Sequence, residues 1–132
     1  MMRLAAVLML LACPAAAETA TAQGAVLRML DKLSGVTEDI TMANGTMLER
    51  GSITIRMDEC RYPENDPSSD AFVHLTVADL RAKALAFDGW MIASSPALSA
   101  MDHPRYDVWV LSCDVPGLET AAPAETDTGE DE

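Results

Sequence analysis

The chain has 132 residues, of which 21 are acidic and 9 are basic, and its formal net charge at pH 7 is −12. A surface with this charge repels phosphate, so we expect no nucleic acid among its partners. A basic protein, a cationic peptide or a divalent ion matches the charge better.

Residues 1–17 have the order of parts found in a secretory signal peptide. Arg3 supplies a positive charge, residues 4–12 form an apolar run, and Ala15 and Ala17 supply the small residues before a cleavage site. The run is much shorter than the ~20 residues of a membrane-spanning helix. We therefore expect cleavage after Ala17, export to the periplasm and no span of the membrane.

A second interpretation of the N-terminus stays open. The tetrapeptide Leu10-Leu11-Ala12-Cys13 resembles a bacterial lipobox. In that case Cys13 would be acylated and become the new N-terminus, and its acyl chains would anchor the protein at a membrane surface. The sequence thus predicts a free periplasmic protein, with a lipid-anchored one as the alternative.

Composition divides the rest of the chain into three parts. Residues 18–24 are a short polar lead-in, residues 25–114 are a single β-domain, and residues 115–132 are an acidic tail rich in alanine, proline and threonine. The tail has little apolar surface to bury, so we expect it to be disordered. A domain of about 90 residues has a small core and a narrow stability margin.

The β-domain contains six segments in which apolar and polar residues alternate, or in which β-branched and aromatic residues predominate. They are residues 26–33, 39–42, 52–58, 71–77, 84–92 and 106–113. The first segment can also be read as a short helix, and we prefer a strand. Together they predict an all-β fold: a small antiparallel β-sandwich or a partly open barrel with one short helical turn.

Turn residues and apolarity indicate how some of these strands are arranged. An Asn-Gly pair follows residues 39–42, which favours a hairpin with residues 52–58. Residues 80–83 form a second hairpin loop. Residues 106–113 are apolar almost throughout, which predicts a central strand covered on both faces, with Trp109 in the core.

Two cysteines, Cys60 and Cys113, remain after either form of N-terminal processing. Because the periplasm is oxidising, this even number predicts a disulfide between them. The chain-entropy estimate for such a loop is about 4 kcal/mol, comparable to the whole stability of a small domain. Two thiols and two distant histidines match no zinc pattern, and we expect neither a metal nor a cofactor.

Residues 94–109 contain the side chains that nucleophilic hydrolysis requires. A triad of Ser95, His103 and Asp107 is the catalytic alternative. However, no Gly-x-Ser-x-Gly elbow frames a serine in this segment. We therefore expect no catalytic residue here and treat a serine-dependent hydrolase as the alternative.

A structural interpretation accounts for the same residues. Ser95 precedes Pro96, a pair that begins a helical turn because serine accepts hydrogen bonds from free amides and proline loses no donor there. Pro104 ends the turn because it excludes the helical conformation for His103. We expect the His103 ring to bond Asp107 or a backbone carbonyl, and to serve stability.

Residues 60–70 place several oxygen ligands of the kind that calcium prefers on one loop, namely Glu64, Asn65, Asp66 and Asp70. The spacing and the glycine of a calcium-binding helix–loop–helix motif are absent. Two prolines already order the loop. We therefore expect a structural loop and no metal site.

Four further residues form a candidate recognition surface. Aromatic residues make up only 5% of the chain, and tryptophan, tyrosine and arginine dominate the binding energy of many interfaces. An exposed aromatic ring beside an arginine would bind a protein or a glycan. The residues are Arg61, Tyr62, Trp90 and Arg105.

Several stretches of this sequence resemble one known family. They are LDKLSG, CRYPENDPSSDAF, the long block GWMIASSPALSAMDHPRYDVW and a closing cysteine. Over residues 25–114 the chain is similar to the alphaproteobacterial domain of unknown function 2155 family. The resemblance implies a small exported envelope protein, and it carries no activity and no catalytic residue. The acidic tail lies outside the match.

These observations favour a non-catalytic periplasmic binding or accessory β-domain that is stabilised by a disulfide. Its partner would be another envelope protein or a glycan. One alternative is a small serine-dependent hydrolase using the block from Ser94 to Asp107. Another is a lipid-anchored accessory subunit of an envelope assembly, in which Cys13 carries the anchor.

Overall fold

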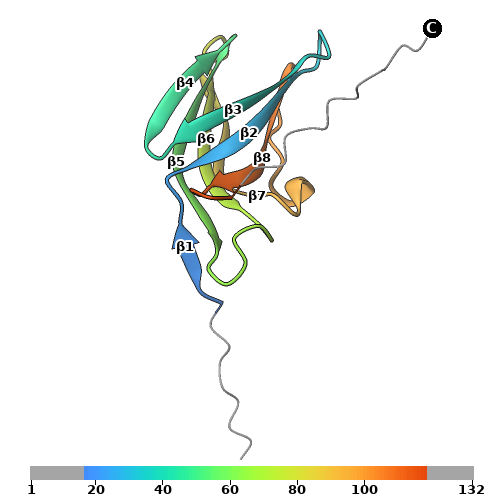
Figure 1. Ribbon diagram of the computed structural model, residues 1–132. Coiled ribbons are helices and arrows are strands. Elements are labelled where there is room, and N and C mark those ends of the chain that lie inside the picture. Colours follow the sequence, from blue (N-terminus) through green and yellow to red (C-terminus); the bar gives the residue numbers. More distant parts are fainter. Residues whose placement is uncertain (1–16, 119–132) are drawn as a thin grey trace, which may run out of the picture.

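The computed structural model describes residues 17–118, most of which lie in β-strands (Figure 1). In chain order the elements are β1 (Thr19–Thr21), β2 (Gly24–Asp31), β3 (Thr37–Ala43), β4 (Thr46–Arg50), β5 (Ile53–Pro63), β6 (Phe72–Asp79), β7 (Ala84–Ile92), the 3₁₀ turn η1 (Pro96–Ser99) and β8 (Tyr106–Asp114). The predicted signal peptide up to residue 16, which includes Cys13, and the tail beyond Leu118 lie outside the described residues. Within residues 17–118, no helix has the length and apolarity needed to cross a membrane.

The strands form two antiparallel sheets. The larger sheet has the order β1-β5-β6-β7, with β4 also paired to β5, and the smaller sheet has the order β3-β2-β8. The sheets pack face to face and do not close into a barrel (Figure 1). This confirms the predicted all-β sandwich with one short helical turn.

The core lies between the two sheets and follows the two-residue period of each strand. In β5 the side chains of Ile53, Ile55 and Met57 are completely buried, as their alternation predicts. The facing positions of β6 and β2 bury Val73, Leu75, Val77, Ala25, Leu27 and Met29. The alternate residues of β5, β6 and β7 are left on the outer face of the larger sheet.

A disulfide links Cys60 in β5 to Cys113 in β8, so it joins the two sheets through the core. The two Cα atoms are 5.7 Å apart, and 53 residues separate the cysteines along the chain. Closing a loop of this length removes about 4 kcal/mol of chain entropy from the unfolded state. The predicted disulfide is confirmed, and it ties strands on opposite sides of the sandwich.

The predicted hairpin between residues 39–42 and 52–58 is wrong. Strand β3 pairs with β2 in the smaller sheet, whereas β5 pairs with β4 and β6 in the larger one. The chain crosses between the sheets at Gly45, where φ is +74° and the N–H donates to the Met57 carbonyl at 2.8 Å. A turn signal therefore located the reversal correctly but did not identify the pairing partner.

Strand β8 is an edge strand of the smaller sheet and not the predicted central strand. Its residues Tyr106, Val108 and Val110 face the core, whereas Trp109 is only half-buried on the other face. The predicted core position of Trp109 is wrong. Its ring lies beside η1, with which it lines a shallow hollow, so an apolar residue on this outer face is still partly covered.

The predicted polar lead-in, residues 18–24, contains a strand that the sequence did not indicate. In β1, Ala20 lies opposite Tyr62 and Thr21 lies opposite Arg61 of β5. Gly24 already begins β2 and lies opposite Asp114 at the end of β8. The first strand and the last residues of β8 therefore both lie at the lower end of the sandwich in Figure 1.

Candidate functional site

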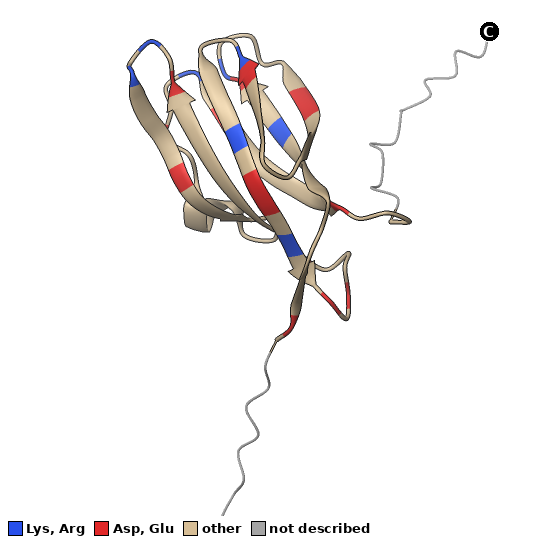
Figure 2. Ribbon diagram, turned by 90° about the vertical axis from the view of Figure 1, so that its left-hand side faces the viewer, with Lys and Arg blue, Asp and Glu red and all other residues tan. Residues whose placement is uncertain are grey.

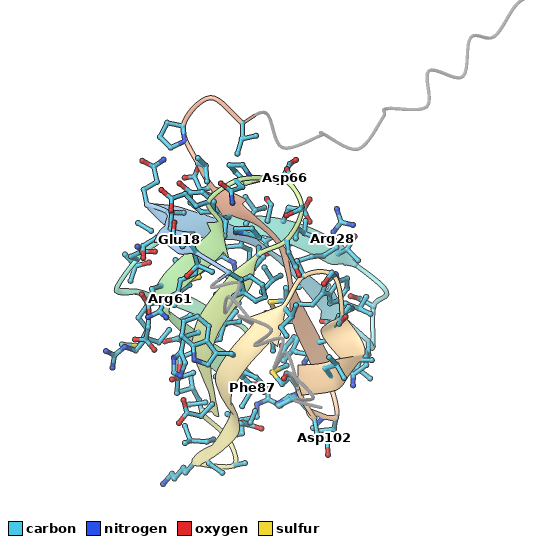
Figure 3. All side chains as sticks on the ribbon, turned by 90° about the horizontal axis from the view of Figure 1, so that it is seen from below. Glu18, Arg28, Arg61, Asp66, Phe87 and Asp102 are labelled. Atoms are coloured by element: carbon cyan, nitrogen blue, oxygen red, sulfur yellow. A yellow bond between two sulfur atoms is a disulfide. The ribbon has the colours of Figure 1, made fainter. Side chains whose placement is uncertain are left out.

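A cluster centred on Arg61 and Trp90 lies on the outer face of the larger sheet. Strand register places Arg61 opposite Phe72, which lies opposite Ile92, and in the next row His74 lies opposite Trp90. Opposed residues share one face of an antiparallel sheet, so these side chains meet on the solvent side. Figure 3 shows Arg61 on the outside of the molecule.

The side chains of this cluster are held by contacts with one another. The Arg61 guanidinium carbon lies 5.0 Å from the centroid of the Trp90 ring, within range of a cation–π interaction. Arg61 Nη2 donates to Glu59 Oε1 at 2.6 Å. The His74 ring meets Trp90 edge to face, with centroids 5.2 Å apart. Trp90 is thus fixed on two sides while 38% of its surface stays exposed.

A shallow apolar hollow opens beside Trp90. Its volume is about 290 Å³, and it is lined by Thr19, Arg61, Phe72, Trp90 and Ile92. Three of the five lining side chains are large and apolar, and the other two, Arg61 and Thr19, carry a guanidinium and a hydroxyl. Such a hollow can take an apolar side chain and place a polar or negative group against Arg61. We name these five residues the Trp90 hollow.

Charged side chains continue the cluster along the sheet. His74 Nδ1 lies 2.8 Å from Asp58 Oδ2, and Asp58 Oδ1 lies 3.0 Å from Arg56 Nε. These groups lie across the same face as the Trp90 hollow and satisfy one another. They form a polar border next to an apolar floor, which is the usual arrangement of a binding surface.

The structure brings together only two of the four residues predicted as a recognition surface. Arg61 and Trp90 are in contact, but Tyr62 packs against the core from the inner side of β5. Arg105 lies elsewhere, where its guanidinium carbon is 5.1 Å from the Tyr106 ring centroid and its Nη2 lies 2.9 Å from Asp31 Oδ2.

Sequence reasoning missed the other members of the site. Phe72 and His74 alternate with the buried residues of β6, which already places them on the outer face, but nothing in the sequence showed that this face meets Trp90. Ile92 and Thr19 join the hollow through the pairing of β7 and β1 with their neighbours.

His103 is buried and both of its ring nitrogens have partners. Nε2 lies 3.0 Å from Asp79 Oδ2, and Nδ1 accepts hydrogen bonds from the backbone N–H groups of Arg105 and Tyr106 at 3.1 and 3.0 Å. Since Nδ1 accepts, Nε2 carries the proton and donates to Asp79. The ring also stacks on Tyr106, with centroids 5.4 Å apart. The expected partners, Asp107 or a carbonyl, are replaced by Asp79.

The remaining members of the hydrolase alternative are engaged elsewhere. Asp107 Oδ1 lies 3.4 Å from Lys32 Nζ. The Ser94 hydroxyl donates to Asp70 Oδ2 at 2.7 Å. Ser95 precedes η1 but its side chain makes no capping hydrogen bond, and η1 ends at Ser99 rather than at the predicted proline. Residues 94–107 therefore do not bring a serine, the imidazole and a carboxylate into one chain of hydrogen bonds.

Hydrogen bonds lower the pKa of carboxylates around this block. The backbone N–H groups of Ala82 and Arg81, with the His103 ring, hold the pKa of Asp79 below its ordinary value. The Arg105 guanidinium lowers the pKa of Asp31 in the same way. These carboxylates are ionised acceptors that fasten loops, so their charge serves the fold.

The loop at residues 60–70 uses Asp66 and Asp70 as acceptors of hydrogen bonds from other protein groups. Burial opposes the ionisation of Asp70, but hydrogen bonds from the Ser94 side chain and backbone hold the pKa of Asp70 below its ordinary value. Asp66 accepts from the Ser68 hydroxyl at 3.0 Å. Across the described part of the chain, no three His, Cys, Asp or Glu side chains are grouped so that they could hold a metal ion.

Comparison with known proteins places the chain among bacterial relatives. An uncharacterised protein of Rickettsia prowazekii (strain Madrid E) is 28% identical over 87 residues, which are 64% of this chain and 56% of that protein. The chain thus matches little more than half the length of this relative. No solved structure matches the chain. A family model described as an uncharacterised protein conserved in bacteria (DUF2155) matches residues 25–113. Since this match covers well over half of the sequence, the chain belongs to the DUF2155 family.

Proposed function

We propose that this protein is an exported, non-catalytic domain of the cell envelope that binds a partner protein through the Trp90 hollow. The signal-peptide pattern of residues 1–17 supports export. The Cys60–Cys113 disulfide supports an oxidising compartment such as the periplasm, because cytosolic thiols are kept reduced.

The single observation that carries the binding role is the Arg61–Trp90 pair beside an apolar hollow. Tryptophan and arginine are the residues most enriched among those that dominate interface energies. Here both are held in place by neighbours before any partner arrives, so binding would order few additional side chains. An apolar side chain of the partner would fill the hollow, and an acidic or polar group would meet Arg61.

The chemistry of the hollow favours a protein over a glycan. A sugar ring needs several hydrogen-bonding groups around its hydroxyls, because buried hydroxyls without partners are costly. The wall of the Trp90 hollow is formed mainly by Phe72, Trp90 and Ile92, which offer few such groups. A protein segment with one large apolar residue suits this lining better.

The hydrolase alternative finds less support. A catalytic base must reach the nucleophile's proton, and both nitrogens of His103 already have partners.

The lipid-anchored alternative remains tied to Cys13. Mass spectrometry of the mature N-terminus distinguishes the free protein from the lipid-anchored one: an N-terminal Glu18 supports the free form, and an acylated Cys13 supports the anchored form.

Differential capture tests the binding role. The purified wild-type domain, Trp90→Ala and Met47→Ala would be immobilised and exposed to a periplasmic extract. Met47 is 67% exposed on β4 of the same sheet but outside the hollow, so it is the matched control. We expect a protein that is retained by wild type and Met47→Ala and lost with Trp90→Ala, and then bound directly once purified.

Two outcomes would contradict this proposal. Equal capture by all three proteins would show that the hollow does not bind the partner. Binding to purified peptidoglycan that disappears with Trp90→Ala would assign the hollow to a glycan instead.

A further inference from the structure

The basic side chains of this acidic protein are distributed unevenly between paired and free states. Within residues 17–118, six of the eight lysine and arginine side chains have a carboxylate within 4.0 Å: Arg28, Lys32, Arg50, Arg56, Arg61 and Arg105. The two without such a partner in this range, Arg81 and Lys83, lie in the same turn between β6 and β7. Most of the cations in the described residues are therefore neutralised by carboxylates, and the two exceptions lie together in one turn.

Exposed leucines flank the two free cations. Leu80 is 45% exposed and Leu85 is 63% exposed, and with Lys83 they line an open hollow of about 290 Å³. We name residues 80–85 the β6–β7 tip. Its sequence, Leu-Arg-Ala-Lys-Ala-Leu, alternates cations with apolar residues and contains no acid.

The backbone of the β6–β7 tip is fixed. Asp79 Oδ1 accepts the N–H groups of Arg81 and Ala82 at 2.8 and 3.1 Å, and the Leu80 N–H donates to the Ser52 carbonyl at 2.8 Å. The Asp79 carboxylate is turned toward these amides and toward His103, which leaves the free cations as the outward charge. Lys83 adopts φ of +52°, a conformation that non-glycine residues rarely take.

A second exposed apolar turn lies at the same end of the sandwich. Leu33 is 76% exposed and Val36 is 63% exposed in the turn between β2 and β3. The two turns are linked through His103. Lys32, next to Leu33, donates from Nζ to the His103 carbonyl at 2.6 Å, and the His103 ring contacts Asp79, next to Leu80. The upper end of Figure 2 carries both blue segments (Lys and Arg) and red segments (Asp and Glu).

We propose that the β6–β7 tip, with the turn at Leu33 and Val36 beside it, docks on the surface of an anionic phospholipid bilayer. Leucines that enter the headgroup boundary next to cations that meet phosphate are the combination that interfacial membrane binding uses. The acidic tail of the chain is a poorer match for this surface. Its carboxylates could pair with the two cations, but residues 119–132 contain no large apolar side chain that could cover the leucines.

The negative net charge of the chain does not prevent this docking. Charges separated by more than a Debye length, about 8 Å at physiological salt, are largely screened. The end of β8 lies at the other end of the sandwich, since Gly24 pairs with Asp114 whereas Asp31 pairs with Tyr106. The acidic tail that follows β8 therefore starts away from the β6–β7 tip. This surface is also separate from the Trp90 hollow.

Vesicle cosedimentation of the mature chain, residues 18–132, tests the proposal. Vesicles of phosphatidylcholine alone would be compared with vesicles that contain phosphatidylglycerol as well. We expect binding to the anionic vesicles only, and its loss at high salt. Each basic residue near an anionic surface contributes roughly a factor of five, so Arg81→Gln with Lys83→Gln lowers the partition coefficient by about twenty-five-fold.

Matched variants separate this site from general charge effects. Arg28→Gln with Arg56→Gln removes the same charge from other surfaces and leaves binding within about threefold of wild type, because Arg28 lies opposite Trp109 and Arg56 opposite Thr76, within their strands and not in the β6–β7 tip. Leu80→Ser with Leu85→Ser weakens binding without changing net charge. Trp90→Ala leaves vesicle binding unchanged, so this proposal and the partner-binding role fail independently.

Three results would overturn the membrane assignment. Equal binding to neutral and anionic vesicles would be the first, and equal losses in the two double glutamine variants would be the second. The third would be no binding to either kind of vesicle. If Lys83 were then acetylated slowly, and fast once residues 119–132 are removed, the β6–β7 tip would be assigned to the acidic tail.

Discussion

His103 Nε2 lies 3.0 Å from Asp79 Oδ2, and this pair connects the loop before β8 to the end of β6. The two strands belong to different sheets, so the contact holds the sandwich together at the end opposite β1. A histidine next to a carboxylate is a common catalytic pair, but here the pair anchors the loop before β8.

Replacing His103 with alanine should destabilise the fold. The change removes the acceptor for two backbone N–H groups and the ring that stacks on Tyr106. We expect a loss of about 2–4 kcal/mol in the free energy of unfolding, measured by chemical denaturation. Asp107→Asn, which alters a half-exposed ion pair with Lys32, is the control and should cost less than about 1 kcal/mol. An alanine variant as stable as wild type would contradict this role.

Stability should fall on acidification because of Asp79 and similar carboxylates. The pKa of Asp79 is lower in the folded state than its ordinary value, so the ionised form favours folding. This contribution is complete above the unfolded pKa of about 3.9 and is lost as pH falls through the folded pKa. We expect the Tm to drop below about pH 4.

Asp79→Asn should make that drop shallower without removing it. Asp31, Asp39 and Asp70 also have lowered pKa values and keep part of the pH dependence. The measurement is the Tm of both proteins across the acidic range. An unchanged slope in the asparagine variant would show that Asp79 does not couple protonation to folding.

A side chain at Gly51 should destabilise the fold. Its φ is +57°, and a Cβ there would collide with the Tyr106 hydroxyl. Gly51→Ala should cost about 3 kcal/mol, whereas Gly45→Ala, with φ of +74° and open space around it, should cost about 1 kcal/mol. Denaturant titration of both variants compares them directly. Equal costs would mean that only the backbone conformation matters and that the Tyr106 contact yields freely.

Removing the disulfide should cost most of the stability of the domain. Cys60→Ser with Cys113→Ser opens a link across 53 residues, for which the chain-entropy estimate is about 4 kcal/mol. Thermal unfolding of the double variant should match that of the reduced wild type. A double variant with the wild-type Tm would show that the link adds nothing to the fold.

Local patterns in the sequence predicted the strands well and their pairings in part: the predicted hairpin loop at residues 80–83 joins the paired strands β6 and β7, but the predicted pairing of β3 with β5 is wrong. Residues 84–92 were expected as a strand and form β7, because alternation and turn residues act within a few positions. Strand β4 carries mostly exposed residues and no clear alternation, so the sequence did not predict it. Without β4, the pattern favoured a pairing of β3 with β5, whereas in the structure β3 pairs with β2. Pairing depends on contacts between distant segments, which a local pattern does not encode.

The candidate site shows the same limit. Arg61 and Trp90 were singled out as scarce residue types, but their contact depends on the order β5-β6-β7 and on its register. Arg105 is equally basic in the sequence, yet it lies in the loop before β8, where it pairs with Asp31 at the end of β2 in the other sheet. Residue type therefore identified candidate binding residues, but only the strand order and register determined which of them share a surface.

The protection of Trp90 in the intact envelope tests the proposed function most directly. Hydroxyl-radical oxidation of Trp90 would be measured in the purified protein and in cells, with Met47 as the exposed internal reference. We predict that oxidation of Trp90 falls in cells while that of Met47 stays the same. Equal oxidation of Trp90 in both samples would contradict the binding of a partner at the Trp90 hollow.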